Sequence, residues 1–303
     1  MQSWDQRQSI ISLAGALAVG LIFCQVILNI RIPRFTLLAT PFVCAWFYYF
    51  NMRRYIRRSR WVRRPFPESW RQILEKHVAY YRQLASGEKK RFERDVCIFL
   101  NENRITGIET EVDERVRLLV ACSAVLLTFG HPEWEYSKLP EILIYPRSFA
   151  EDYSVDSHPG ERTLTGIIVP QNGIVISKPE LLEAFERPDE AYHVGLHEFA
   201  HALDLADGSA EGIPADLHPR RVPEWDQLMQ EELRRVRQRQ SILNPYAGKN
   251  RAELFAVAVE YFFQRSRDLK ERHEQLYRAM ADFFNQDPAK DRTQMDTDGT
   301  DRH

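Results

Sequence analysis

The sequence predicts an α+β fold, mostly helical with a small sheet, preceded by an N-terminal transmembrane segment or hairpin. Three observations support this: uncharged runs followed by arginines at the N-terminus, short β-branched runs near the middle, and apolar residues at helical spacing elsewhere. The chain has 303 residues, enough for one sizeable domain with an appendage. We expect a membrane anchor at 1–64, a globular domain at 65–286 and a disordered tail at 287–303.

The overall composition excludes some classes of protein. The chain has 41 basic and 43 acidic residues, so no general basic excess indicates nucleic-acid binding. Its four cysteines form no C-x-x-C pair, which argues against a disulfide framework or a cysteine zinc site. The cysteine usage fits a reducing compartment.

The N-terminal segment is apolar enough to cross a membrane. No charge occurs from Ile10 to Ile30, and at ~1.5 Å per residue this run spans a bilayer core of ~30 Å. A second uncharged run from Phe35 to Met52 is near the short limit, and aromatic residues at its end suit a membrane interface. One or two spans therefore both remain possible.

The charges that follow predict the orientation. Seven arginines and no acidic residue lie between Arg53 and Arg64. By the positive-inside rule, the domain after them faces the cytoplasm from the inner membrane. A cleaved signal peptide or a buried core helix is less favoured, because the N-terminus is weakly basic and the first run is long. Lipid headgroups suit these arginines better than nucleic acid does, because they adjoin an apolar run.

The remaining elements follow from periodicity. Helices are expected from 69 to about 130, including an apolar helix at 116–129 that we interpret as buried because it starts among charges. Strands are expected at 141–145, 166–169 and 173–177, the last two forming a hairpin. Further helices are expected at 179–185, 189–206, 225–240, 251–265 and 269–285.

The string His197-Glu198-Phe199-Ala200-His201 carries the chemistry. On a helix the two histidines lie one turn apart on one face, so both imidazoles can bind one zinc ion. Glu198 lies beside them and can accept a proton from water. Such a pattern arises by chance in on the order of one chain in a hundred, so it needs support from its surroundings.

Two nearby residues on this helix have different predicted roles. Asp204 lies two turns after His197, where it can accept a hydrogen bond from a ligand imidazole or a neighbour and fix its orientation. The alternative is a charge near the C-terminal half of the helix without such a role, which the helix dipole slightly disfavours. His193 lies too far from His201 for one tetrahedral site, and we interpret it as a rim or packing residue.

A third metal ligand is expected downstream. The helix from Arg251 is almost wholly apolar but carries Glu253 and Glu260, seven residues apart and so on one face. Buried carboxylates need partners, which a metal and a ligand imidazole would provide. We therefore expect Glu253 to bind the metal and Glu260 to support a ligand. Ion pairs with arginines such as Arg234 or Arg265 are the alternative.

These motifs resemble a known family. The strings H-E-F-A-H-A-L-D, D-G-S-A-E-G-I-P and N-P-Y-A-G-K-N-R-A-E-L-F-A-V-A-V-E-Y-F-F are similar to those of the Mlc titration factor A family of zinc peptidases, which is similar in turn to the anthrax lethal factor catalytic domain. The resemblance covers about residues 67 to 287. It implies a zincin-like domain, metal ligands at His197, His201 and Glu253, and a base at Glu198. It also implies that Tyr246 hydrogen-bonds the oxyanion of the reaction, whereas the residues alone favour an ordinary turn residue in Asn-Pro-Tyr.

The expected function is a gluzincin-type zinc peptidase with one zinc per chain, acting on a peptide or protein. We expect the substrate to lie extended against the strand at 173–177. The alternative is a membrane-tethered regulatory module that binds a cytoplasmic protein such as a transcription repressor, with proteolysis secondary. A purely structural zinc site is disfavoured, because such a site does not need Glu198.

Overall fold

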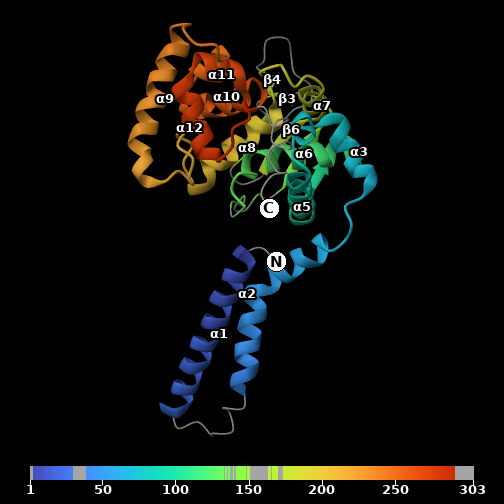
Figure 1. The fold of residues 1–303 in the computed structure, drawn as a ribbon, viewed down its shortest axis with the longest axis vertical. Helices are drawn as coiled ribbons and strands as arrows, with labels where there is room; N and C mark the ends of the chain where they lie inside the picture. Colours follow the sequence, from blue (N-terminus) through green and yellow to red (C-terminus); the bar gives the residue numbers. More distant parts are fainter. Residues whose placement is uncertain are drawn as a thin grey trace, which may run out of the picture. The chain divides into compact units, whose positions relative to one another are not determined.

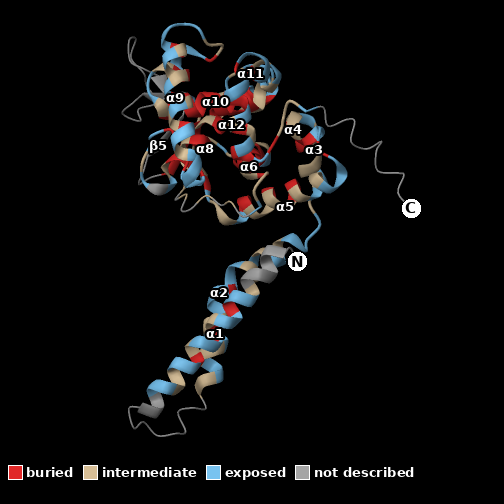
Figure 2. Cartoon of the chain, turned by 60° about the vertical axis from the view of Figure 1, so that its left-hand side comes forward, coloured by how far each residue is buried: buried red, intermediate tan, exposed pale blue. Residues whose placement is uncertain are grey.

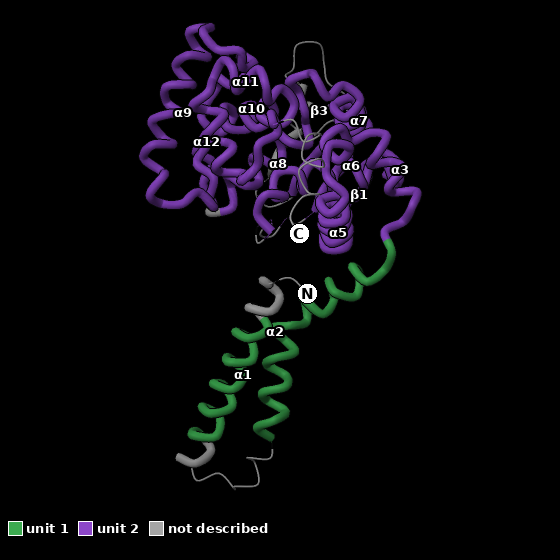
Figure 3. The backbone as a smooth tube through the Cα atoms, viewed as in Figure 1, with its two compact units in different colours: residues 1–65 green, residues 66–303 purple. Residues whose placement is uncertain are grey.

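The computed structural model describes residues 3–29, 39–132 and 173–290, together with the shorter pieces 134, 136, 139, 141–147, 149–150, 163–164 and 166–169. It divides into two compact units, residues 1–65 and residues 66–303 (Figures 1 and 3). The predicted tail beyond residue 290 lies outside the described residues.

The described residues of unit 1 form two helices, α1 (Ser3–Asn29) and α2 (Thr40–Val62). Helix α1 contains an 18-residue window, Ser9–Val26, that is long and apolar enough to cross a membrane. Among the described helices α1 alone meets that test, because α2 continues from its apolar half into the arginine cluster without a break. Most residues of both helices are exposed or half-buried (Figure 2).

Unit 2 begins with a series of helices. In order they are α3 (Glu68–His77), α4 (Ala79–Arg82), α5 (Ser86–Glu102) and α6 (Glu114–Thr128). Strand β1 (Ile105–Gly107) interrupts the stretch that we expected to be wholly helical. The predicted burial of the apolar helix is confirmed, since eleven residues of α6 are buried.

The sheet has the order β1-β2-β6-β5. Strands β1, β2 (Ile142–Tyr145) and β6 (Gly173–Ser177) are parallel, and β5 (Gly166–Val169) pairs antiparallel with β6, so the predicted hairpin is confirmed. A separate pair joins β3 (Phe149–Ala150) to β4 (Thr163–Leu164). The expectation that a substrate adds to 173–177 is wrong, because β6 has a partner on each side.

The core lies where α8 (Val194–Asp204) packs against α6, α10 (Arg251–Gln264), β5 and β6. Eleven of the 14 residues of α10 are buried, and it is red along its length in Figure 2. Gly195 permits the close approach of α8 to α6, since a Cβ there would lie 2.2 Å from Ser123 Oγ. The remaining elements are listed here: α7 (Lys178–Glu186), η2 (Leu205–Asp207), η3 (Pro219–Arg221), α9 (Val222–Arg237), η4 (Pro245–Gly248), α11 (Ser266–Arg272) and α12 (Glu274–Phe284).

The single helix expected at 269–285 is instead two helices that meet at His273. The buried His273 side chain is the reason. Its Nδ1 lies 2.8 Å from Glu232 Oε2, and its Nε2 lies 3.3 Å from both Ser241 Oγ and the Ile242 amide nitrogen. The His273 side chain thus connects the C-terminal helices to α9 and to the loop before η4.

Candidate metal centre

Helix α8 starts five residues later than the predicted 189, because His193 caps it. The Leu196 amide donates to His193 Nδ1 over 3.2 Å. The ring of His193 is buried and packs edge-on against Phe185, with ring centroids 4.6 Å apart. Burial lowers its pKa to about 3, so the ring stays neutral and its Nδ1 remains an acceptor. His193 is therefore a capping and packing residue.

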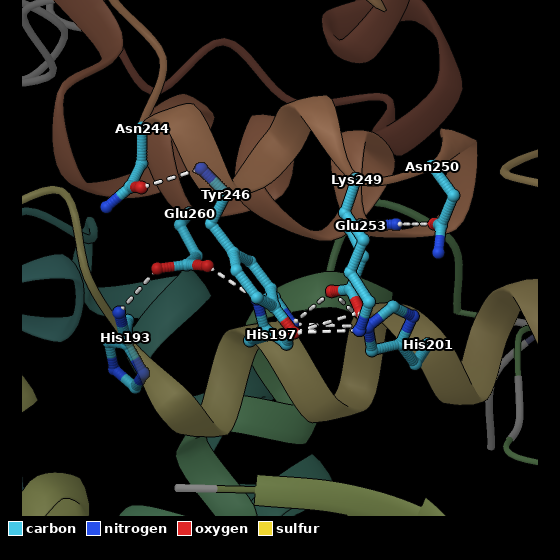
Figure 4. Close-up of polar contacts among 9 residues, drawn as sticks. All are labelled: His193, His197, His201, Asn244, Tyr246, Lys249, Asn250, Glu253 and Glu260. Carbon is cyan, nitrogen blue, oxygen red and sulfur yellow. Dashed lines mark hydrogen bonds and ion pairs between the residues drawn. The ribbon is translucent and has the colours of Figure 1, made fainter. Parts of the chain in front are cut away.

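Three potential ligand atoms lie close together between α8 and α10 (Figure 4). Two belong to histidines one turn apart on α8, and the third belongs to a glutamate on α10. His197 Nε2 and His201 Nε2 are 3.1 Å apart, and Glu253 Oε2 lies 3.2 Å and 3.3 Å from them. The three atoms all lie within 4.8 Å of one another. Two imidazole nitrogens and one carboxylate oxygen form a donor set suited to zinc.

The second oxygen of Glu253 is held from the opposite side. Its Oε1 accepts from Tyr246 Oη at 3.1 Å and lies 3.2 Å from Lys249 Nζ. Asn250 caps α10 by accepting from the Glu253 amide over 2.9 Å, which fixes the backbone at this residue. We did not predict Lys249, although its position four residues before Glu253 was a signal that it could reach that carboxylate.

Glu260 contacts both ends of the first turn of α8. Its Oε1 lies 2.6 Å from His197 Nδ1, and its Oε2 accepts from the His193 amide over 2.8 Å. The arginines considered as alternative partners, Arg234 and Arg265, pair with Glu231 and Asp268 instead. A carboxylate on the far nitrogen of an imidazole orients the ring and raises its basicity as a ligand.

The charges in the cluster are strongly coupled. Burial opposes a proton on His197, but hydrogen bonds with Glu253 and Glu260 outweigh it and raise the pKa of His197 to about 10. Burial likewise opposes ionisation of Glu253, yet the two histidines hold its pKa well below the usual range. A cation is thus favoured between these side chains, and a proton on His197 takes that role in the metal-free protein.

Glu198 lies in the same buried environment without a matching partner. The residue is 3% exposed, and its Oε2 has no hydrogen-bond partner among the described residues. Burial raises the pKa of Glu198 to about 8, with Glu253 and Glu260 adding repulsion. A buried carboxyl oxygen left unpaired at the edge of the ligand set fits a centre that holds a metal ion and a reacting water.

Asp204 holds the loop after α8, and Tyr246 contacts the cluster through Glu253. Asp204 is fully buried, and its Oδ2 accepts from the Gly212 amide over 2.9 Å, which pins the loop after α8. Gly212 has a φ of 70°, and a Cβ there would lie 2.4 Å from Arg251 O, so this loop lies against the start of α10. Tyr246 is 46% exposed and borders the ligand atoms through its bond to Glu253.

Comparison with known proteins identifies several relatives of this chain. An uncharacterized protein of Synechocystis, slr2042, is 26% identical over 246 residues, which cover 77% of this chain and 89% of that protein. Mlc titration factor A of Pectobacterium atrosepticum is 30% identical over 208 residues, covering 63% of this chain and 76% of the relative. The same-named protein of Edwardsiella ictaluri is 30% identical over 202 residues, covering 62% and 74%.

The matched region includes the whole cluster. The family described as glucose-regulated metallo-peptidase M90 matches residues 52–285, which is more than half of the chain and contains α8, η4 and α10. The resemblance noted from the sequence motifs is therefore confirmed. This chain belongs to the M90 family of metallopeptidases.

Proposed function

We propose that the chain is a gluzincin-type zinc peptidase with a zincin-like domain, in which His197, His201 and Glu253 hold one zinc ion. One observation carries the proposal: three potential ligand atoms converge near a buried carboxylate, Glu198, one oxygen of which has no hydrogen-bond partner among the described residues. A structural zinc site would fill its coordination with protein ligands and would need no buried base. The M90 match supports a metallopeptidase of this kind.

The proposed chemistry assigns a task to each side chain. Zinc, when bound, supplies a Lewis acid that polarises a substrate carbonyl and lowers the pKa of water to about 7. Glu198 accepts the proton that the attacking water loses and donates it to the leaving amine, a double role suited to a carboxyl whose pKa lies near neutrality. Tyr246 donates a hydrogen bond to the oxyanion. Glu260 holds His197 in position through Nδ1.

The sheet suggests where a peptide would bind. Strand β5 stands at the edge of the described sheet, with β6 on one side of it, and packs near α8. An edge strand offers unpaired main-chain groups to an extended peptide, whereas β6 offers none. We therefore place the substrate along β5. A structure with a bound peptide that lacks main-chain bonds to Gly166–Val169 would contradict this placement.

The test of the peptidase uses the full-length protein in detergent, with zinc content measured directly. Wild type and Glu198→Gln are incubated with a mixed peptide library, and products are identified by mass spectrometry. We expect cleavage by wild type alone, with equal zinc in both proteins. Cleavage by neither zinc-loaded protein would overturn the proposal, and equal cleavage by both would remove Glu198 from the mechanism.

The location proposed for this activity is the inner membrane, with unit 2 in the cytoplasm. The apolar window Ser9–Val26 supports a membrane segment. The seven arginines after it support the orientation, because basic residues next to a span stay on the cytoplasmic side.

A regulatory role is the second candidate. Two of the relatives carry the name Mlc titration factor A, which indicates a role in binding a regulator. In this chain the metal domain would then retain a cytoplasmic protein, such as a transcription repressor, at the membrane. Equal physiological effects of wild type and Glu198→Gln, with a partner captured by both, would favour this candidate over proteolysis.

A further inference from the structure

The apolar surface of the described molecule is concentrated in unit 1. Twelve of the fourteen large apolar or aromatic side chains that are exposed in the described residues lie in α1 and α2. They include Leu21 at 72% exposure on α1 and Phe42 at 77% on α2. Soluble proteins rarely expose apolar patches of this extent. Since both helices contribute, the surface to be covered belongs to the pair and not to α1 alone.

The two helices are antiparallel and closely packed. Cys24 Sγ lies 3.4 Å from Thr40 Oγ1, and a Cβ on Gly20 would lie 2.4 Å from Cys44 Sγ. Farther along, a Cβ on Gly15 would lie 3.1 Å from the ring of Phe47. As the residue number falls along α1, the number of the contacting residue on α2 rises, so the helices are antiparallel. Small residues at such contacts let membrane helices approach closely.

This pairing fixes the depth of α2. Its residues from 40 to 47 lie against residues 15 to 24 of α1, which form the middle of the window Ser9–Val26. If that window crosses the bilayer, the apolar half of α2 must lie in the hydrocarbon region too. Continuing the same pairing brings Arg53 level with the residues near Ser9, where the window begins.

We propose that α1 and α2 enter the bilayer together as an antiparallel hairpin, with the N-terminus and unit 2 on the same side. The hairpin rests on the membrane location proposed above and is independent of peptidase activity. The charges agree with it: seven arginines lie at the open end after Met52, whereas the connection between the helices carries only Arg31 and Arg34. Anionic headgroups are the expected partners of the larger cluster.

The first test determines the topology of the full-length chain. Different epitope tags are placed at the N- and C-termini, and intact bacterial spheroplasts are treated with protease. We expect the protein to remain in carbonate-washed membranes and both tags to resist cleavage until lysis. Cleavage of the N-terminal tag alone would overturn the hairpin, leaving α1 as a single span. Cleavage of both would support the hairpin but overturn the cytoplasmic orientation. A soluble protein would overturn the membrane location itself.

The second test measures the helix contact. In a background of Cys24→Ala, Cys97→Ala and Cys122→Ala, Gly20→Cys is compared with Leu21→Cys, whose side chain points away from α2. Membranes are oxidised, and remaining thiols are counted by maleimide labelling after denaturation. In the Gly20→Cys protein we expect the introduced cysteine and Cys44 to form a disulfide, so that neither thiol is labelled. In the Leu21→Cys protein we expect both thiols to be labelled. Equal loss, or no loss in either variant, would overturn the described pairing.

Discussion

Two pairs of apolar helices in this molecule are built in opposite ways. In α1 and α2 the apolar side chains face outward, and most are exposed. In α8 and α10 the apolar side chains face the protein core, and polar groups meet between the helices at His197, Glu253 and Glu260. In each pair one helix, α1 or α10, has no exposed charge over several turns. The difference lies in the polar residues: carboxylates in α10 require partners that only a folded core supplies.

The largest expected effect comes from placing a charge in each pair. Leu17→Asp in α1 introduces a charge at an exposed apolar position, which disfavours insertion by about 3 kcal/mol, or roughly a hundredfold. Leu254→Asp in α10 places an unpaired charge at a fully buried site. We expect Leu17→Asp to leave carbonate-washed membranes but to keep its zinc.

The matched variant should show the reverse behaviour. Leu254→Asp should remain in the membrane while unit 2 loses zinc and becomes protease-sensitive. Membrane retention is measured by immunoblotting and zinc by elemental analysis of the same samples. If both variants lose zinc equally, the two helix pairs do not depend on separate environments.

The next effect tests the partner of the metal ligand. Glu260→Gln removes the charge beside His197 Nδ1, so we expect zinc affinity to fall by about 10- to 100-fold. The control is Glu271→Gln on the exposed surface of α11. Competition with a chelator measures both affinities. An affinity equal to that of the control would show that Glu260 serves α8 only through the His193 amide.

A smaller effect tests close packing at a helix contact. Gly195→Ala places a Cβ 2.2 Å from Ser123 Oγ and 2.8 Å from Ser123 Cβ, so we expect a loss of about 1–3 kcal/mol in the free energy of unfolding. Gly87→Ala in α5 meets nothing within 4 Å and should be neutral or stabilising by up to about 1 kcal/mol. Thermal unfolding compares them. Equal midpoints would show that α8 and α6 are farther apart than described.

The last prediction concerns the change in zinc affinity with pH, which is expected to be gradual. The pKa of His197 is raised to about 10 in the metal-free protein, so at lower pH a proton must leave before the ring can bind zinc. Zinc affinity should therefore rise with pH, by at most about tenfold per pH unit between pH 6 and 8. Calorimetry in buffers of different ionisation heats would detect the released proton. A flat profile would contradict the proton's position.

The sequence could predict those features that depend on spacing along one element. The histidines of α8 and the carboxylates of α10 were found because side chains three, four or seven residues apart share a helix face. The sheet order could not be found this way, because strand pairing depends on distant segments. Strand β1 was missed for a related reason: its three residues are too few for a periodic pattern.

The same limit applies to capping and to contacts between elements. His193 was expected inside a longer helix, but its ring accepts a hydrogen bond from the Leu196 amide, so the helix begins just after it. Lys249 and Tyr246 meet Glu253 through the turn η4, whose position depends on His273 and the loop that it holds. The spacing of four residues was a signal for the contact of Lys249 with Glu253, but no local pattern predicts that Tyr246 reaches the same carboxylate.

The two bonds of Glu260 link metal retention to local unfolding. One oxygen accepts from the His193 amide at the start of α8, and the other lies against His197, a proposed metal ligand one turn later. If the first turn of α8 unwinds, the support of His197 is lost in the same event. Amide hydrogen exchange at His193 and the rate of zinc release should therefore have a common opening step, so that unwinding of this one turn would be enough to loosen the metal.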